Sequence, residues 1–386
     1  MSTPTEALLE ALAGVYDPEL RKPITELGMV ESAVVENGTA AVKVLLTIEG
    51  CPLRTTIEQD VREAAEAVDG VESVQVEIGY MNADQRADLR KNLGHTKKNP
   101  FAEKNTLTRV FAVVSGKGGV GKSSMTANLA AAFASQGLGV GIVDADVHGF
   151  SIPGLMGISQ PPTRMDDMIL PPVVEAPQNP EKPGSGTAAT PSFVKVISIG
   201  MFVEGNQPVA WRGPMLHRAL EQFLTDVHFG ALDVLLLDLP PGTGDIALSM
   251  AQLLPNAELV LVSTPQHAAV DVAERAGTLS LQTKQKVAGV IENMAAMVMP
   301  DGSRMEVFGS GGGEQLSSRL TETLDYEVPL LGSVPLEMEL RTGGDEGMPI
   351  VWGRPDSAAA REIKEIARKL SHQQRGLAGK SLPLNF

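Results

Sequence analysis

The sequence predicts an α/β fold in which a mostly parallel sheet is preceded by a smaller α/β unit. From residue 108 onward, short apolar segments alternate with helical stretches, which is typical of a parallel sheet buried on both faces. A glycine-rich loop also lies between the first of these segments and a helix. Ligands of such sheets bind at the carboxyl ends of the strands, so we expect the functional residues there.

Seven apolar segments are expected to form the strands of this sheet. They are 109–115, 140–144, 194–199, 234–238, 259–264, 287–291 and 330–334. An alanine-rich stretch at 123–136 is expected to be the helix that follows the glycine-rich loop. The region 159–192 interrupts the alternation with eight of the chain's 26 prolines, and we expect part of it to be a mobile loop.

The length of 386 residues favours more than one domain. We expect a small α/β domain at 1–80, a linker at 81–107 and a P-loop NTPase domain at 108–386. The linker is polar, and a helix within it at 83–93 is left open. The elements expected in the small domain are helices at 6–13 and 55–68 and strands at 29–35, 41–48 and 73–78.

Charge and composition limit the classes of partner. The net charge of −15 argues against binding to nucleic acids or anionic membranes, although local basic patches stay compatible with it. No apolar run reaches the roughly 18 residues that span a bilayer, and Glu6 and Glu10 lie where a secretory signal would be basic. We therefore expect a cytoplasmic protein. The single cysteine, Cys51, excludes an intrachain disulfide and a zinc site built from the cysteines of one chain.

The glycine-rich loop has the pattern of a triphosphate cradle. Its glycines allow backbone N–H groups to turn toward phosphate oxygens, and the helix that follows adds its partial positive charge. In this pattern Lys122 reaches the β- and γ-phosphates and Ser123 binds Mg²⁺. The loop reads Gly116-Lys117-Gly118-Gly119-Val120-Gly121-Lys122-Ser123, and Ser124 follows it.

Acidic residues end two of the expected strands. Asp144 and Asp146 follow one strand, where they lie near Mg²⁺ or an attacking water, and Asp146 is our candidate for orienting that water. The alternative is that both only cap the turn. Asp238 ends another strand and is expected to hold Mg²⁺, through a water molecule, with Asp144 as a further candidate ligand. A glycine in the turn after Asp238 can present its N–H to the γ-phosphate.

Lys117 stands at the start of the loop, from where it can reach a nucleotide held by a facing subunit. In this the chain resembles the deviant Walker A ATPases, the class that includes the MinD and ParA proteins, and within it the Mrp/ApbC family of iron-sulfur cluster carriers. The motifs that carry the resemblance are the loop itself, Asp144-Ala145-Asp146, Trp211-Arg212-Gly213-Pro214-Met215, Asp238-Leu239-Pro240-Pro241-Gly242-Thr243-Gly244-Asp245, Glu292-Asn293-Met294, Phe308-Gly309-Ser310-Gly311-Gly312-Gly313 and Gly343-Gly344-Asp345.

The resemblance implies a homodimer that hydrolyses ATP to ADP and phosphate with Mg²⁺ and delivers iron-sulfur clusters to apoproteins or assembly factors. It implies that Lys117, Lys122 and Asp146 are catalytic and that Asn293 contacts adenine, although an asparagine there can also simply close a turn. The implied nucleotide-binding residues are Gly116, Gly118, Gly119, Val120, Gly121, Lys122, Ser123, Ser124 and Asn293.

The amino-terminal unit resembles a small domain of iron-sulfur assembly factors, through Asp17-Pro18-Glu19-Leu20, Ile24-Thr25-Glu26-Leu27-Gly28 and Gly50-Cys51-Pro52-Leu53. Cys51 lies between a strand and an expected helix start, where the helix N-terminus would stabilise its thiolate as a cluster ligand. The alternative is an inert, partly buried thiol.

The chain departs from the family at two places. Where many members carry Cys-x-x-Cys, it reads Met299-Pro300-Asp301-Gly302. A 4Fe-4S cluster is held by four thiolates, and a dimer of this chain owns two, which argues against the usual cluster site in the ATPase domain. His148-Gly149-Phe150-Ser151 also replaces the more usual Gly-Pro-Ser. Two other functions therefore stay open: a partition or positioning ATPase, and an ATP-driven adaptor for cluster assembly that binds no cluster itself.

Overall fold

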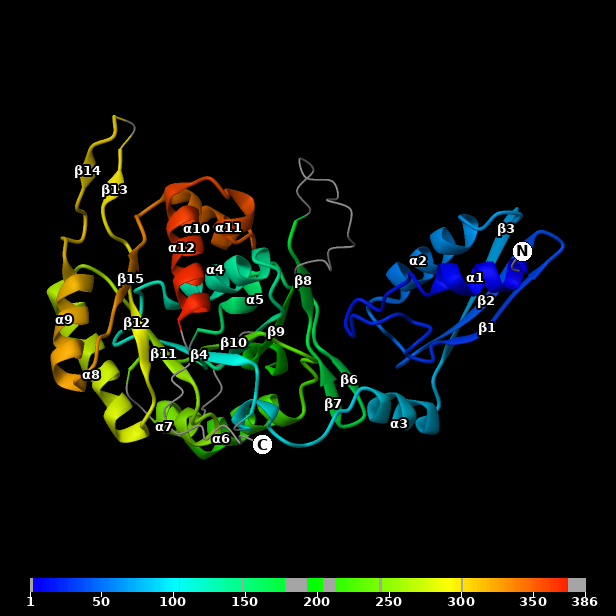
Figure 1. The fold of residues 1–386 in the computed structure, drawn as a ribbon, viewed down its shortest axis with the longest axis horizontal. Helices are drawn as coiled ribbons and strands as arrows, with labels where there is room; N and C mark the ends of the chain where they lie inside the picture. The colour runs from blue at the N-terminus through cyan, green and yellow to red at the C-terminus, as the bar shows by residue number, and fades with distance from the viewer. Residues whose placement is uncertain are drawn as a thin grey trace, which may run out of the picture.

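The computed structural model describes residues 3–103, 105–147, 149–177, 193–203, 213–242, 245–299 and 301–373. Within them the largest sheet has eight strands in the order β15-β12-β11-β4-β10-β5-β9-β8 (Figure 1). All neighbouring pairs are parallel except β8 with β9. The expected fold class is therefore confirmed.

All seven expected strands form, with ends that shift by at most one residue. They are β4 (Arg109–Val114), β5 (Val140–Asp144), β9 (Phe193–Ser198), β10 (Val234–Asp238), β11 (Glu258–Ser263), β12 (Val287–Glu292) and β15 (Leu330–Ser333). The antiparallel edge strand β8 (Val173–Glu175) was not anticipated.

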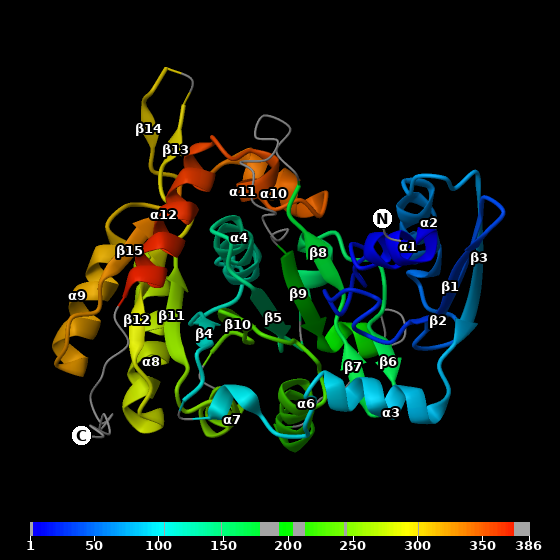
Figure 2. The same ribbon diagram turned by 45° about the vertical axis from the view of Figure 1, so that its right-hand side comes forward.

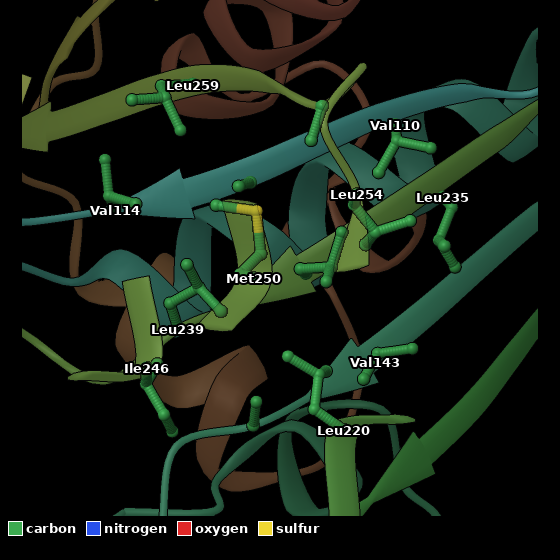
Figure 3. Packing of buried hydrophobic residues seen from close by; sticks show 14 of the residues in the cluster. Val110, Val114, Val143, Leu220, Leu235, Leu239, Ile246, Met250, Leu254 and Leu259 are labelled. Atoms are coloured by element: carbon green, nitrogen blue, oxygen red, sulfur yellow. The ribbon is translucent and has the colours of Figure 1, made fainter. Parts of the chain in front are cut away.

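Helices cover both faces of the sheet (Figure 2). The strand residues alternate between the two resulting cores, as in β4, where Val110 and Val114 pack on one side and Phe111 and Val113 on the other. Figure 3 shows the first of these cores, with Leu220 and Met250 among its members. Its helices are α6 (Gly213–Thr225), α7 (Asp245–Leu253), α8 (His267–Thr283) and α9 (Gly312–Leu324). The opposite face carries α4 (Lys122–Ser135), α5 (Ile152–Leu155), α10 (Met338–Asp345), α11 (Ile350–Gly353) and α12 (Ala358–His372).

The amino-terminal unit has its own three-stranded sheet in the order β1-β2-β3, in which β1 and β2 are antiparallel and β2 and β3 parallel. Its elements lie within two residues of those expected. They are α1 (Pro4–Leu12), β1 (Val30–Glu36), β2 (Thr39–Leu46), α2 (Arg54–Glu66) and β3 (Ser73–Tyr80).

The segment 81–107 is more structured than its polar sequence indicated. It contains α3 (Ala83–Asn92), with a capping box at its start, and the short 3₁₀ helix η1 (Pro100–Ala102). Phe101 is buried in one core of the large sheet. The segment therefore packs against the rest of the chain at Met81, Leu89 and Phe101.

In the proline-rich region 159–192, part of which we expected to be a mobile loop, the first half contains regular elements that the sequence did not indicate. It forms the hairpin of β6 (Thr163–Met165) and β7 (Met168–Leu170), followed by β8. Met165, Met168 and Leu170 of this hairpin join the core of the amino-terminal unit, whereas Ile169 packs in the first core of the large sheet. Residues 178–192 lie outside the described part of the chain.

A second hairpin, β13 (Met297–Val298) with β14 (Arg304–Met305), extends beyond the sheet (Figure 1). The short helix η2 (Ile199–Phe202) follows β9. In the part of the chain that the structure describes, no helix combines the length and the apolar character needed to cross a membrane.

Candidate nucleotide-binding site

The expected site residues meet at the carboxyl edge of three adjacent strands. Asp238 at the end of β10 is in register with Asp144 at the end of β5, and Asp144 is in register with Ser198 at the end of β9. The glycine-rich loop leaves the neighbouring strand β4 at the same edge. Parallel pairing therefore brings together residues that lie far apart in the sequence.

The backbone of the loop depends on glycine at two positions. Gly121, the N-cap of α4, has φ +81°, and a Cβ there would lie 2.2 Å from Asn293 Nδ2. A Cβ on Gly116 would lie 2.4 Å from the backbone N of Ala273 in α8. The loop is therefore held between Asn293 and α8, which fixes its shape.

Lys122, Ser123 and Asp238 form the centre of the site. Lys122 is 6% exposed, and its Nζ lies 2.7 Å from Asp238 Oδ2. Ser123 Oγ donates to the same oxygen at 2.5 Å, and Thr126 Oγ1 donates to Asp238 Oδ1 at 2.8 Å. A serine hydroxyl beside a buried carboxylate is a hard-oxygen donor set that suits Mg²⁺. The two expected metal-binding residues are thus brought together.

Asp144 is fully buried, and both of its carboxylate oxygens accept hydrogen bonds. Its Oδ2 accepts from Ser198 Oγ at 2.9 Å and its Oδ1 from the backbone N of Asp146 at 3.2 Å. Burial, and then the charge of Asp238, raise the pKa of Asp144 to about 8. These contacts agree with the turn-capping alternative, and a magnesium role for Asp144 stays a prediction.

Asp146 lies in the same cluster, 7% exposed, with its Oδ2 3.6 Å from Lys122 Nζ. This places its carboxylate beside the lysine that is expected to reach the terminal phosphates. Its role in orienting water stays a prediction.

Lys117 points away from its own loop. Its Nζ donates to Gln266 Oε1 at 3.0 Å, and Gln266 is the N-cap residue of α8. The contribution of Lys117 to a second subunit stays a prediction.

Asn293 is hydrogen-bonded to the backbone of the glycine-rich loop. It is 2% exposed, and its Nδ2 donates to the Val120 carbonyl at 2.9 Å. Its Oδ1 is buried and finds no hydrogen-bond partner among the described residues, so one polar atom of this amide is left for a ligand. Contact with adenine stays a prediction.

Cys51 is half-buried, and two opposing effects act on the pKa of its thiol. It follows β2 and precedes α2, and backbone N–H groups of Leu53 and Arg54 do stabilise its thiolate. Burial outweighs them, and the carboxylates of Glu19 and Asp17 act in the same direction as burial, so the pKa of the Cys51 thiol is raised. The raised pKa favours the alternative of a partly buried thiol, and a role for Cys51 as a cluster ligand stays a prediction. Across the described residues, no group of three or more histidine, cysteine or acidic side chains is arranged to hold a metal ion.

Three polar partners of the site escaped the sequence analysis: Thr126, Ser198 and Gln266. Thr126 lies one helical turn after Lys122, a spacing that could have indicated it. Several quoted motif residues, namely His148, Trp211, Arg212, Thr243, Gly244 and Pro300, lie outside the described residues. In the turn after Asp238, the Gly242 N–H already donates to the Ser115 carbonyl at 2.9 Å.

Comparison of the sequence with known proteins shows the family to which the chain belongs. A family model described as NUBPL iron-transfer P-loop NTPase matches residues 106–371, and one described as iron-sulfur cluster assembly protein matches residues 5–78. The iron-sulfur cluster carrier protein of Mycobacterium leprae is 53% identical over 383 residues, covering 98% of this chain and 96% of that protein.

The iron-sulfur cluster carrier protein of Synechocystis is 38% identical over 373 residues, covering 95% of this chain and 97% of that one. Among solved structures, a nucleotide-binding protein of Archaeoglobus fulgidus in complex with ADP matches with a TM-score of 0.49 and 35% identity, covering 62% of this chain and 86% of that one. The sequence matches run through both units and confirm the resemblance seen in the motifs. The chain belongs to the iron-transfer P-loop NTPase family of the iron-sulfur cluster carrier proteins.

Proposed function

We propose that this protein is an ATPase whose nucleotide cycle assists the transfer of iron-sulfur clusters to apoproteins in the cytoplasm. The observation that carries the proposal is the convergence of Lys122, Ser123 and Asp238 at the end of β10, in a chain that matches cluster carrier proteins over nearly its whole length. The family match supports iron-sulfur clusters as the cargo, and the geometry of the site supports ATP hydrolysis as the reaction.

The proposed roles follow from the contacts. Glycines of the loop turn backbone N–H groups toward the phosphates, and Lys122 exchanges its ion pair with Asp238 for contact with the β- and γ-phosphates. Ser123 and Asp238 would hold Mg²⁺, which when bound neutralises phosphate charge. Asp146, beside Lys122, orients the water that attacks the γ-phosphate.

The second cation of the site comes from a second copy of the chain. Lys117 contacts Gln266 of its own subunit, which leaves the start of its own loop without that charge. In a homodimer with the two nucleotide edges facing, Lys117 of each subunit leaves Gln266 and contacts the triphosphate of the other. Charge supplied in trans stabilises the phosphoryl-transfer transition state.

The test of hydrolysis is phosphate release from purified full-length protein with ATP and Mg²⁺. We expect Lys122→Ala to abolish it, because the buried ammonium is the main cation at the terminal phosphates. Lys364→Ala, a change to a lysine of α12 that bonds the Pro355 carbonyl, is the matched control and should retain activity. Hydrolysis that survives Lys122→Ala would disprove the enzymatic half of the proposal.

A second candidate function is favoured by the cysteine chemistry. One cysteine per chain, with a raised thiol pKa, supplies few thiolates for a cluster, which favours an ATP-driven adaptor that brings donor and acceptor proteins together. Iron and sulfide content of the protein isolated without oxygen distinguishes the two. Bound iron that Cys51→Ser removes supports direct carriage, whereas no iron together with intact ATP hydrolysis supports the adaptor.

A further inference from the structure

A cavity of about 470 Å³ lies where the amino-terminal unit, the segment after α3 and the large sheet meet. It is formed by the loop at 20–22, residues 93–101, the start of β9, and the chain between α6 and β10. A volume of this size is typical of small-molecule sites. The nucleotide edge lies at the other end of β9, where Ser198 contacts Asp144.

The lining of this cavity is basic although the chain as a whole carries a charge of −15. Among the described residues that line it, no aspartate or glutamate occurs. Six lining side chains are cationic or imidazole groups: Arg21, Lys22, His95, Lys98, Lys195 and His228. They come from both units and from the segment between them, so the charge is concentrated by the tertiary fold.

Lys195 is the most informative of the six. Lys195 is 2% exposed. Among the described residues, no side chain forms an ion pair or hydrogen bond with its ammonium. Its Nζ lies 6.0 Å from the centroid of the Phe193 ring. A buried ammonium without a bonded partner is costly, and a ligand that supplies the partner offsets this cost.

The nearest acidic side chains, Asp17 and Glu19, do not bond to the ammonium of Lys195. Asp17 accepts from the backbone N–H groups of Glu19 and Leu20 through Oδ1, and Glu19 Oε1 accepts from Thr163 Oγ1 at 2.6 Å. Both attract Lys195 electrostatically without bonding to it. Burial lowers the pKa of Lys195 to about 8, so most of the ammonium is charged at neutral pH.

The polar groups converge on one part of the cavity. A Cβ built on Gly230 would lie 3.9 Å from both Lys195 Nζ and His228 Nε2, so these two nitrogens border the same small space. The rings of His95 and His228 meet edge to face at 5.8 Å. His95 Nε2 is buried and has no hydrogen-bond partner among the described residues.

The backbone and the aromatic residues complete the site. Arg21 has φ +57°, an uncommon conformation for a residue other than glycine. Its guanidinium forms an ion pair with Glu175 and lies 5.0 Å from the centroid of the Phe193 ring. Phe101 and Phe229, which also line the cavity, pack edge to face at 5.8 Å. An apolar surface thus adjoins the cationic one.

We propose that this cavity binds a small organic phosphate, of about the size of a nucleoside monophosphate, whose phosphate group lies between Lys195, His228 and His95. Several donors from different elements match the several oxygens of a phosphate better than the two of a carboxylate. The aromatic side chains contact the organic part. The site is separate from the nucleotide edge and goes beyond the proposed ATPase.

The test uses full-length protein with Lys122→Ala as background, which weakens phosphate binding at the glycine-rich loop. Calorimetric titration with AMP and with inorganic phosphate should show one binding event per chain. Adding Lys195→Met, which keeps the length of the side chain, should weaken it by about tenfold or more. Lys91→Met, at an exposed position of α3 outside the cavity, is the matched control. Absence of binding, or binding that Lys195→Met leaves unchanged, overturns the proposal.

Thermal unfolding separates a ligand site from a structural charge. Because Lys195→Met removes a buried charge without a bonded partner, we expect the variant to melt at a higher temperature than its parent. AMP should raise the melting temperature of the parent and not that of the variant. A lower melting temperature for Lys195→Met would assign the ammonium to stabilising Asp17 and Glu19 and would also overturn the proposal.

Discussion

At the scale of single residues, two lysines of the candidate nucleotide site are held by polar contacts within the chain. Lys122 is paired with Asp238, and Lys117 is bonded to Gln266. In the proposed cycle both lysines exchange these contacts for phosphate oxygens, which would link nucleotide binding to conformation.

The Lys117 contact gives a test of dimerisation. Lys117→Ala should lower ATP hydrolysis by about 100-fold or more, because a cation supplied in trans is worth at least that much in related reactions. Gln266→Ala, which removes only the contact within the subunit, should leave hydrolysis nearly unchanged. Both are measured as phosphate release at saturating ATP.

Mixing variants shows whether Lys117 acts in trans. Lys117→Ala and Lys122→Ala are each expected to be inactive alone. A mixed dimer has one site with an intact Lys122 and a Lys117 from the partner, so the mixture should regain activity. If the mixture stays inactive while dimers form, the lysine does not act across the interface.

The sequence indicated the central residues of the site because each stands at a strand end or in the glycine-rich loop. Ser198 and Gln266 could not be indicated in this way, since their roles depend on which strand ends and helix starts become neighbours. The direction of the Cys51 pKa shift could not be predicted for a related reason. The burial and the acidic groups that raise its pKa come from the fold around it and not from its own helix.

At the scale of elements, the hairpin β6–β7 is the largest departure from expectation. Its strands have three residues each and lie among prolines, so no periodic pattern identifies them. By contrast, the longer apolar strands of the large sheet were placed within one residue. The length of an apolar segment, more than its composition, decided whether a strand could be predicted.

The hairpin supports a stability prediction. Met165 is fully buried in the core of the amino-terminal unit, so Met165→Ala should lower the free energy of unfolding by about 2–4 kcal/mol. Arg164→Ala, at an exposed position of the same strand, should change it by less than about 0.5 kcal/mol. Urea unfolding followed by circular dichroism measures both, and equal effects would show that the hairpin does not contribute to that core.

At the scale of the whole molecule, the junction between the two units is electrostatically unusual. Glu19 is buried there beside Asp17 and Lys195, and burial raises its pKa from 4.5 to about 7. The folded chain therefore binds a proton at Glu19 that the unfolded chain has lost between these two pH values. This contribution to stability is present below pH 4.5 and is lost as the pH rises through 7.

Replacing Glu19 tests this pH dependence. Glu19→Gln keeps an acceptor for Thr163 and cannot ionise, so relative to wild type it should gain on the order of 2 kcal/mol in unfolding free energy between pH 5 and pH 7.5. Glu26→Gln, at an exposed position, should show no such gain. The comparison is made by urea unfolding at several pH values. A constant difference between Glu19→Gln and wild type would contradict a titration at Glu19 in this range.

The hairpin β6–β7 also bears on how such a protein can be divided or recombined. Met165, Met168 and Leu170 are encoded within the stretch that matches the NTPase family, yet they complete the hydrophobic interior of the first eighty residues. A fragment ending near residue 80 would leave that interior open to water, and the remainder would expose three apolar side chains. Grafting the amino-terminal unit onto another NTPase would therefore require the hairpin to be transplanted with it.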